Sequence, residues 1–349
     1  MGKNAWLIVS DLHLYYKNLS SRIDYVAEMQ RVRSKIVRIG ERYKSAGWSV
    51  GLLLLGDVFH RSYNDTFLSN YDNNFFVMWR QQFGPCFSVV GNHELHYYAS
   101  NPFFTLVKTI ESEKVRQIVK DVWTPQGLLP TIRIVDRLED GDVIFHFNHY
   151  GTPVSKPETG KINVGLFHQD VYNDMILRDA ERKAGRVWGA DKPVSLDVVS
   201  GYQYCFFGHM HKLYDVYRNE EGGLLYYLAS LGRTNSSEVN DECLERCVPV
   251  VLVENGSLVS VKEEKFELES RAECVKEEVV QEAKEQYVLQ KLRAEARSYA
   301  PLDDNPIDGL KQFFNDNPLA LAVVNGLLCN PIDEIGTSIK QRFESIGGR

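Results

Sequence analysis

The sequence contains no hydrophobic run long enough to cross a lipid bilayer. Its most apolar stretch, residues 319–328, has about half of the roughly 20 residues that a membrane-spanning helix needs, and Asn325 interrupts it. Cysteine is scarce as well, because six residues are spread over 349 without the density or pairing of a secreted disulfide scaffold. We therefore expect a cytoplasmic protein that does not insert into a membrane.

A block of basic residues is also missing. The 40 Lys and Arg are outnumbered by 47 Asp and Glu, and most of the resulting net charge of -7 lies beyond residue 261. Composition therefore disfavours a nucleic-acid partner weakly, since a local basic groove is compatible with a nearly neutral total. Hydrophobic residues make up 44% and charged residues 25%, which excludes disorder over the whole length and indicates a globular chain.

Short apolar runs alternate with helical patterns over the first two-thirds of the chain. They predict strands at residues 6–9, 50–55, 87–90, 143–147, 163–167, 204–207, 225–229 and 248–253. Between the first two runs, apolar residues recur at three- and four-residue steps from Ile23 to Tyr43, which predicts one helix. Several strands end directly on Asp, Asn or His, at the edge where α/β proteins build their sites.

The sequence changes character from about residue 270. Apolar residues recur along a charged helix predicted at residues 271–298. Farther on, Asn-Pro-Ile-Asp occurs at Asn305 and again at Asn330, where Asn can cap a helix and Pro can begin it. We expect an α/β catalytic domain at residues 1–265 and a small helical appendage at residues 266–349.

Five polar blocks at strand ends carry the chemistry. They are Asp11-Leu-His13, Gly56-Asp57, Gly91-Asn92-His93-Glu94, His168 and Gly208-His209-Met-His211. Oxygen and imidazole donors without thiolates suit Mn²⁺, Fe or Zn²⁺. The adjacent glycines fit a backbone that turns sharply beside a metal and a phosphate. The sequence therefore predicts a catalytic metal site.

The five blocks, in this order, resemble the motif set of the calcineurin-like metallophosphoesterases: D-x-H, G-D, G-N-H-[DE], a separate His and G-H-x-H. This resemblance covers about two-thirds of the chain. It implies a four-layer αββα sandwich, with two mixed sheets packed face to face and helices outside. It also implies two divalent metal ions, for which Mn²⁺ is the expected identity and Fe or Zn²⁺ are the alternatives.

The same resemblance implies a role for each block. One ion would be held by Asp11, His13 and His211, the other by Asn92, His168 and His209, with Asp57 bridging the two. A metal pair of this kind activates a bridging hydroxide, which attacks the phosphorus during in-line displacement. His93 would stabilise the phosphate and protonate the leaving oxygen.

Within that superfamily, the block from Gly56 to His60 resembles the SbcD-type DNA repair exonuclease subunits, where a His at this place helps to handle DNA. Residues 226–233 are similar to the strand and turn that follow G-H-x-H in those nucleases, including phage-encoded members. Arg233 is then a candidate phosphate contact. We therefore predict a DNA nuclease, while a solvent-facing His60 and a solvated turn arginine are the alternatives for these two residues.

Two other functions stay open. Glu94 is commoner among phosphatases than among these nucleases, so a phosphatase or a small-molecule phosphodiesterase is the first alternative. A non-enzymatic scaffold that the metal stabilises is the second. In the nuclease family the C-terminal part caps the site and binds an ABC-type ATPase, so residues 266–349 are expected to bind such a subunit, unless they pack on their own domain. A homodimer is the other partner considered.

Overall fold

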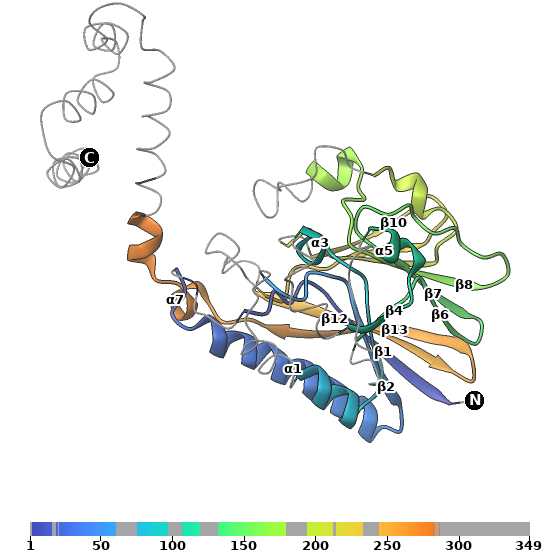
Figure 1. The fold of residues 1–349 in the computed structure, drawn as a ribbon, viewed down its shortest axis with the longest axis horizontal. Coiled ribbons are helices and arrows are strands. Elements are labelled where there is room, and N and C mark those ends of the chain that lie inside the picture. Colours follow the sequence, from blue (N-terminus) through green and yellow to red (C-terminus); the bar gives the residue numbers. More distant parts are fainter. Residues whose placement is uncertain are drawn as a thin grey trace, which may run out of the picture. The chain divides into compact units, whose positions relative to one another are not determined.

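The computed structural model describes residues 2–15, 19, 21–60, 75–96, 107–118, 132–178, 194–211, 214–232, 244–282 and 286. Arg233 and nearly all of the predicted appendage lie outside these residues. The chain divides into two units, residues 1–276 and 277–349. The first unit carries both sheets and all five polar blocks (Figure 1).

Two β-sheets form the centre of the first unit. The seven-stranded sheet has the order β13 (Ser257–Glu267), β12 (Glu245–Glu254), β1 (Lys3–Val9), β2 (Ser49–Leu54), β3 (Cys86–Ser88), β5 (Ile132–Ile134) and β4 (Val107–Ile110). The six-stranded sheet has the order β10 (Asp215–Arg218), β11 (Leu224–Tyr227), β9 (Tyr204–Phe207), β8 (Ile162–Phe167), β7 (Val143–Asn148) and β6 (Arg137–Asp140). Both sheets are mixed, with parallel central strands and antiparallel strands at an edge.

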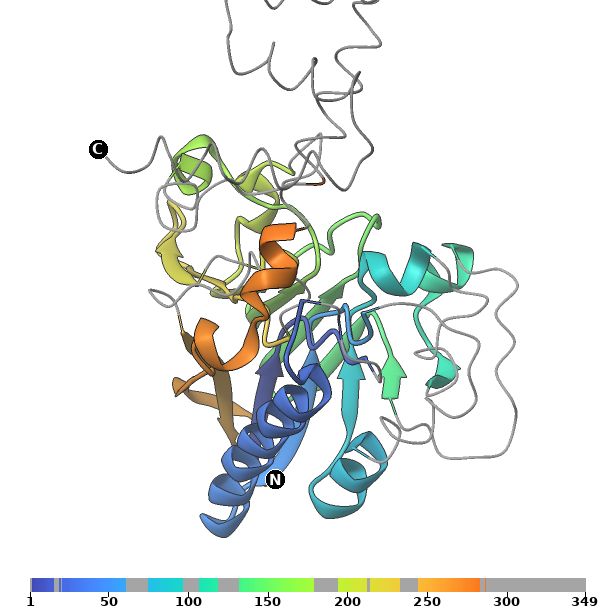
Figure 2. The ribbon, with the colours of Figure 1, turned by 90° about the vertical axis from the view of Figure 1, so that its left-hand side faces the viewer.

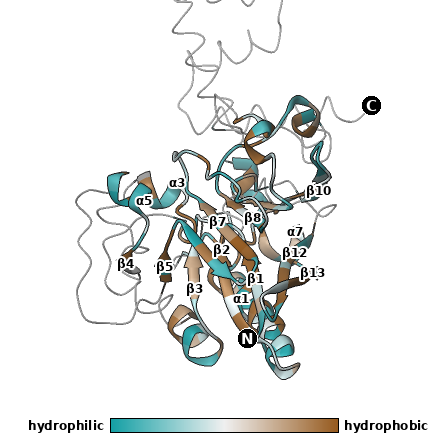
Figure 3. Ribbon diagram, turned by 90° about the vertical axis from the view of Figure 1, so that its right-hand side faces the viewer, coloured by the Kyte–Doolittle hydropathy of each residue, from teal (hydrophilic) through white to brown (hydrophobic). Residues whose placement is uncertain are grey.

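Alternating side chains of each strand decide how the layers stack. In β1, Leu7 and Val9 face helix α1 (Tyr25–Ser45), whereas Trp6 and Ile8 face the second sheet. This is the two-residue period of a strand that is buried on both faces. The strands in Figure 3 are correspondingly hydrophobic through the middle of the molecule. The predicted αββα sandwich is confirmed.

Helix α1 covers the outer face of the seven-stranded sheet (Figure 2). Its N-cap, Asp24, accepts a hydrogen bond from the backbone N of Ala27 at 2.9 Å, and basic residues occupy its last turn. Its buried face includes Met29, Val32 and Ile36, at the spacing that the sequence predicts. Figure 2 shows the helix running along the strands, so that its N-terminal end lies toward the edge that carries the polar blocks.

The helix predicted at residues 271–298 is interrupted at its start. Helix α7 (Arg271–Cys274) stops at Val275, which pairs with Arg22 in an isolated bridge, and the backbone N of Ile23 donates to the Cys274 carbonyl at 2.9 Å. Tertiary pairing therefore overrides the helical period here. No described helix is both long and apolar enough to cross a membrane. The domain boundary after residue 265 stays a prediction.

Candidate metal centre

Four residues predicted as metal ligands have a left-handed backbone. The φ angle is 41° at Asp11, 45° at His13, 45° at Asp57 and 78° at His209. A non-glycine residue in this region stores strain of about 1–3 kcal/mol, which the surrounding structure must hold. In the described part of the chain the only other such residue is Asn255, in the turn between β12 and β13. Backbone strain is therefore concentrated just past the ends of β1, β2 and β9.

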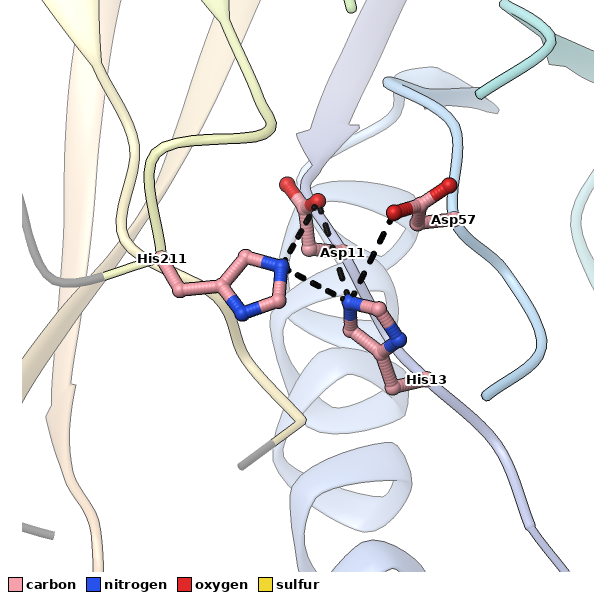
Figure 4. Close-up of side chains that lie close together, drawn as sticks. All are labelled: Asp11, His13, Asp57 and His211. Carbon is pink, nitrogen blue, oxygen red and sulfur yellow. Dashed lines mark hydrogen bonds and ion pairs between the residues drawn. The ribbon is translucent and has the colours of Figure 1, made fainter. Parts of the chain in front are cut away.

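The first cluster of possible ligands consists of Asp11, His13, Asp57 and His211 (Figure 4). The Nε2 atoms of His13 and His211 face each other at 2.9 Å. Asp11 Oδ1 lies 3.6 Å from His211 Nε2, and Asp57 Oδ2 lies 3.8 Å from His13 Nε2. Metal–ligand bonds are about 2.0–2.2 Å, so the ligands of one ion lie roughly 3 Å or more apart. The four side chains have this spacing.

The second cluster consists of Asp57, His168 and His209. His168 Nε2 lies 3.3 Å from Asp57 Oδ2, 3.3 Å from His209 Nδ1 and 2.9 Å from Asn92 Oδ1. The other ring nitrogen of His168 lies 2.6 Å from the Leu55 carbonyl, which turns Nε2 toward the cluster. Among the described residues, Asp57 is the one that belongs to both clusters, so its carboxylate could serve two ions.

The Glu94 side chain stabilises the backbone around Asp57. It is buried, and its two carboxylate oxygens accept hydrogen bonds from the backbone N of Asp57 at 2.9 Å, Gly91 at 2.7 Å and Val58 at 2.8 Å. Burial, followed by the neighbouring Asp57 charge, raises the pKa of Glu94 to about 8, while the backbone N–H groups act in the opposite direction. Glu94 thus fixes the turn that presents the Asp57 carboxylate.

His93 and His60 lie beside the first cluster. The backbone N of His93 donates to Asp57 Oδ1 at 2.9 Å, and its ring Nδ1 lies 2.8 Å from the His60 carbonyl. A carbonyl only accepts, so Nδ1 carries a proton and Nε2 is the nitrogen that faces the site, 3.9 Å from Asp57 Oδ2. The His60 ring lies 6.2 Å from the His93 ring and 5.9 Å from the His13 ring, between centroids. The structure thus brings His60 to the site.

The glycines of the motifs leave room for the carboxylates. A Cβ atom on Gly91 would lie 2.2 Å from Asp57 Oδ1, and one on Gly208 would lie 2.7 Å from Asp11 Oδ2. Neither distance is possible for real atoms. These two positions therefore leave no room for a side chain.

Without a metal ion, electrostatics inside the clusters favour a neutral His13, an ionised Asp57 and a protonated His168. Burial, followed by His211, holds the pKa of His13 well below its usual value, which leaves a lone pair for a metal. Burial opposes ionisation of Asp57, but His168 and His13 hold its pKa well below the usual range. Burial would lower the pKa of His168, yet the charges of Asp57 and Asp11 raise it to about 9. A bound cation would replace that proton.

One buried carboxylate of the site escapes the sequence analysis. Asp170 Oδ2 lies 3.4 Å from His209 Nε2, and the Asp170 side chain is only 3% exposed. Its position two residues after His168 is the one signal in the sequence, and this signal does not say which histidine the carboxylate faces. Arg233, the predicted phosphate contact, lies outside the described residues.

Comparison with known proteins gives a family match and several distant structural similarities. The family model described as calcineurin-like phosphoesterase matches residues 6–213. No curated protein matches the chain significantly. Among solved structures, a 5′-nucleotidase precursor from Thermus thermophilus is 16% identical, with a TM-score of 0.37, and the similarity covers 83% of this chain and 59% of that one.

Two other solved structures show the same range of similarity. A dimetal phosphatase from Danio rerio is 10% identical, with a TM-score of 0.39, and the similarity covers 76% of this chain and 99% of that one. An NAD nucleotidase from Haemophilus influenzae is 12% identical, with a TM-score of 0.35, and coverage is 76% and 50%. The chain thus spans 59% and 50% of the length of the two nucleotidases. The family match extends over more than half of the chain and includes every polar block, and the chain belongs to the calcineurin-like phosphoesterase family.

Proposed function

We propose that the chain is a two-metal phosphodiesterase that acts on DNA, of the SbcD type. The observation that carries the proposal is that Asp57 belongs to two ligand clusters at once. Two divalent ions at such a site supply Lewis-acid activation of water and a clamp on the attacking and leaving oxygens. Mn²⁺ is the proposed ion, because the donors are carboxylate, amide and imidazole.

The residues present fit such a pair. Asp57 Oδ2 is buried and makes no well-aligned hydrogen bond within the described residues. A buried carboxylate oxygen without a donor is costly unless a cation faces it. By the spacing above, Asp11, His13 and His211 would hold one ion, while His168, His209 and Asn92 would hold the other.

The chain's own acid is His93. Its ring is 35% exposed, and its Nδ1 is occupied by the His60 carbonyl, so Nε2 faces both the site and incoming substrate. When Nε2 also takes up a proton, the ring becomes an imidazolium that can deliver this proton to a leaving oxygen and return to the Nδ1–H tautomer. His93 is therefore proposed to bind the phosphate and to protonate the departing group.

His60 supports the choice of a diester over a monoester. A diester carries a second organic group beside the reacting phosphate. The His60 ring lies next to the His93 ring and is proposed to donate a hydrogen bond to this second group. The Tyr15 ring, 5.4 Å from the His60 ring between centroids, extends the same surface. Base–aromatic stacking and imidazole–phosphate contacts are both consistent with single-stranded DNA at this place.

The test is degradation of end-labelled single- and double-stranded DNA in the presence of Mn²⁺. Asp57→Asn should abolish it, because the shared carboxylate holds both clusters together, and the exposed Asp142→Asn should leave it unchanged. Hydrolysis of monoesters alone would replace the proposal by a phosphatase, and metal binding without hydrolysis by a scaffold. Cytoplasmic location and an ABC-type ATPase subunit that binds residues 266–349 remain parts of the proposal.

A further inference from the structure

The two ring nitrogens of His209 face two different groups. Its Nδ1 lies 3.3 Å from His168 Nε2, on the side of the second cluster. Its Nε2 lies 3.4 Å from Asp170 Oδ2, a side-chain carboxylate on the opposite side of the ring. His168 differs, because its second nitrogen lies 2.6 Å from the uncharged Leu55 carbonyl, while the Asp11 Oδ1 atom is farther away, at 3.9 Å.

Asp170 is held rigidly in this position. Its carbonyl accepts a hydrogen bond from the backbone N of Val194 at 2.8 Å, and the next residue, Val171, is fully buried and pairs with Val194. The loop that follows β8 therefore delivers two groups to one metal position. His168 would bind the ion directly, and Asp170 would face the far side of a second ligand.

Burying a carboxylate is costly unless a positive or strongly polarised hydrogen faces it. With Nδ1 of His209 directed at a metal, the only proton of the neutral ring resides on Nε2, where Asp170 can accept it. The contact then selects the tautomer of His209 and fixes its ring, while the negative charge makes the ring a better electron donor.

We propose that Asp170 is a positioning residue that tunes the affinity of the second cluster for its metal ion through His209. The inference rests on the proposed two-metal site and deepens it. Removing such a carboxylate partner of a metal-bound histidine typically weakens metal affinity about 10–100-fold. Only one of the two ions should be affected, because the first cluster does not contain His209.

The experiment is a calorimetric titration of metal-stripped protein with Mn²⁺. The wild-type chain is expected to bind two ions, and Asp170→Asn to bind one with unchanged affinity and the other about 10–100-fold more weakly. Asp174→Asn, an exposed carboxylate on the same segment, is the matched control and should behave as wild type. Paramagnetic resonance gives an independent readout, since two adjacent Mn²⁺ ions give a spin-coupled spectrum and a lone ion does not.

The outcomes separate the two proposals. A wild-type chain that binds no Mn²⁺ refutes the two-metal site itself. If Asp170→Asn binds two Mn²⁺ ions with wild-type affinity, the role of Asp170 is refuted. The same holds if the metal-free variant has a lower melting temperature but binds Mn²⁺ as the wild type does, because Asp170 then only stabilises the fold. If Asp170→Asn does not fold, Asp170→Glu replaces it: the longer carboxylate must weaken one ion, and unchanged binding of both contradicts the inference.

Discussion

Replacing Glu94 tests how the turn that carries Asp57 is stabilised. The two oxygens of this buried side chain accept backbone N–H groups from Asp57, Val58 and Gly91. In Glu94→Ala all three groups lose this acceptor. In Glu94→Gln one oxygen remains, and the new amide N–H₂ must face at least one backbone N–H, because both are donors.

The expected magnitude follows from the number of donors. A buried donor left without an acceptor costs about 1–3 kcal/mol, so three of them would cost about 3–9 kcal/mol if none were hydrated. Water entering the space left by the side chain reduces this sum, and we expect about 3 kcal/mol for Glu94→Ala. Glu94→Gln, with one mismatched donor, should lose about 1–2 kcal/mol.

The assay is urea unfolding of the metal-free protein at about pH 9, above the Glu94 pKa of about 8, so that both carboxylate oxygens accept. The midpoint and the slope together give the free energy of unfolding. Glu113→Ala is the control, since that side chain is 67% exposed and its removal should change stability by less than about 0.5 kcal/mol. The reasoning would be refuted by a Glu94→Ala variant as stable as Glu113→Ala, or by a Glu94→Gln variant less stable than Glu94→Ala.

Three further predictions concern the same site. Gly91→Ala places a Cβ atom against Asp57 Oδ1, so Mn²⁺ affinity measured by calorimetry should fall at least about tenfold, whereas Gly2→Ala, with open space around it, should not change it. His93→Asn should slow DNA cleavage about 10²–10⁴-fold while Mn²⁺ binding stays intact, and equal loss of both would contradict an acid role. The folded-state pKa values of about 8 for Glu94 and about 9 for His168 exceed the ordinary values of 4.5 and 6.5. Burial lowers the pKa of His13, His146 and His149, which opposes this effect near pH 6.5, but these three groups are largely deprotonated in both states above about pH 7.5. Between about pH 7.5 and 8 the folded metal-free protein therefore binds more protons than the unfolded chain. Its melting temperature should therefore fall as the pH rises through this window, and a rise would count against these shifts.

Much of the site can be predicted from the sequence because of one geometric rule. Polar residues just past the carboxyl ends of neighbouring parallel strands must gather at one edge of the sheet. Asp11 and Asp57 follow the neighbouring strands β1 and β2 in this way and fall in one cluster of possible ligands, whereas His209 follows β9 of the other sheet and joins Asp57 in the second cluster. The glycine positions are predictable for a related reason, since a backbone that passes a carboxylate this closely excludes a Cβ atom.

Other features depend on contacts that no local pattern encodes. Asp170 faces His209 from the loop after β8, and the next residue of that loop, Val171, pairs with Val194. This pairing joins residues that are far apart in the chain. The interruption at Val275 likewise arises from its pairing with Arg22, which lies near the beginning of the sequence. The helical period continues through Val275, so the sequence alone favours an unbroken helix.

The sequence pattern does not predict the edge strand β13 for another reason. This strand reads SLVSVKEEKFE, in which apolar and polar residues do not alternate strictly, and none of its residues is fully buried. Its charges contact helix α1, where Tyr43 donates to the Glu264 carboxylate at 2.7 Å and Arg42 pairs with the same group. Charged edges of this kind also prevent pairing with other chains.

The central claim is that two metal ions sharing Asp57 hydrolyse a phosphodiester. The most direct test is hydrolysis of bis(p-nitrophenyl) phosphate by the metal-stripped chain after addition of Mn²⁺, compared between wild type and Asp57→Asn. The account predicts turnover that requires Mn²⁺ and falls to background in Asp57→Asn, whose amide cannot bridge two cations. Turnover of the diester that is equal in both proteins would contradict it.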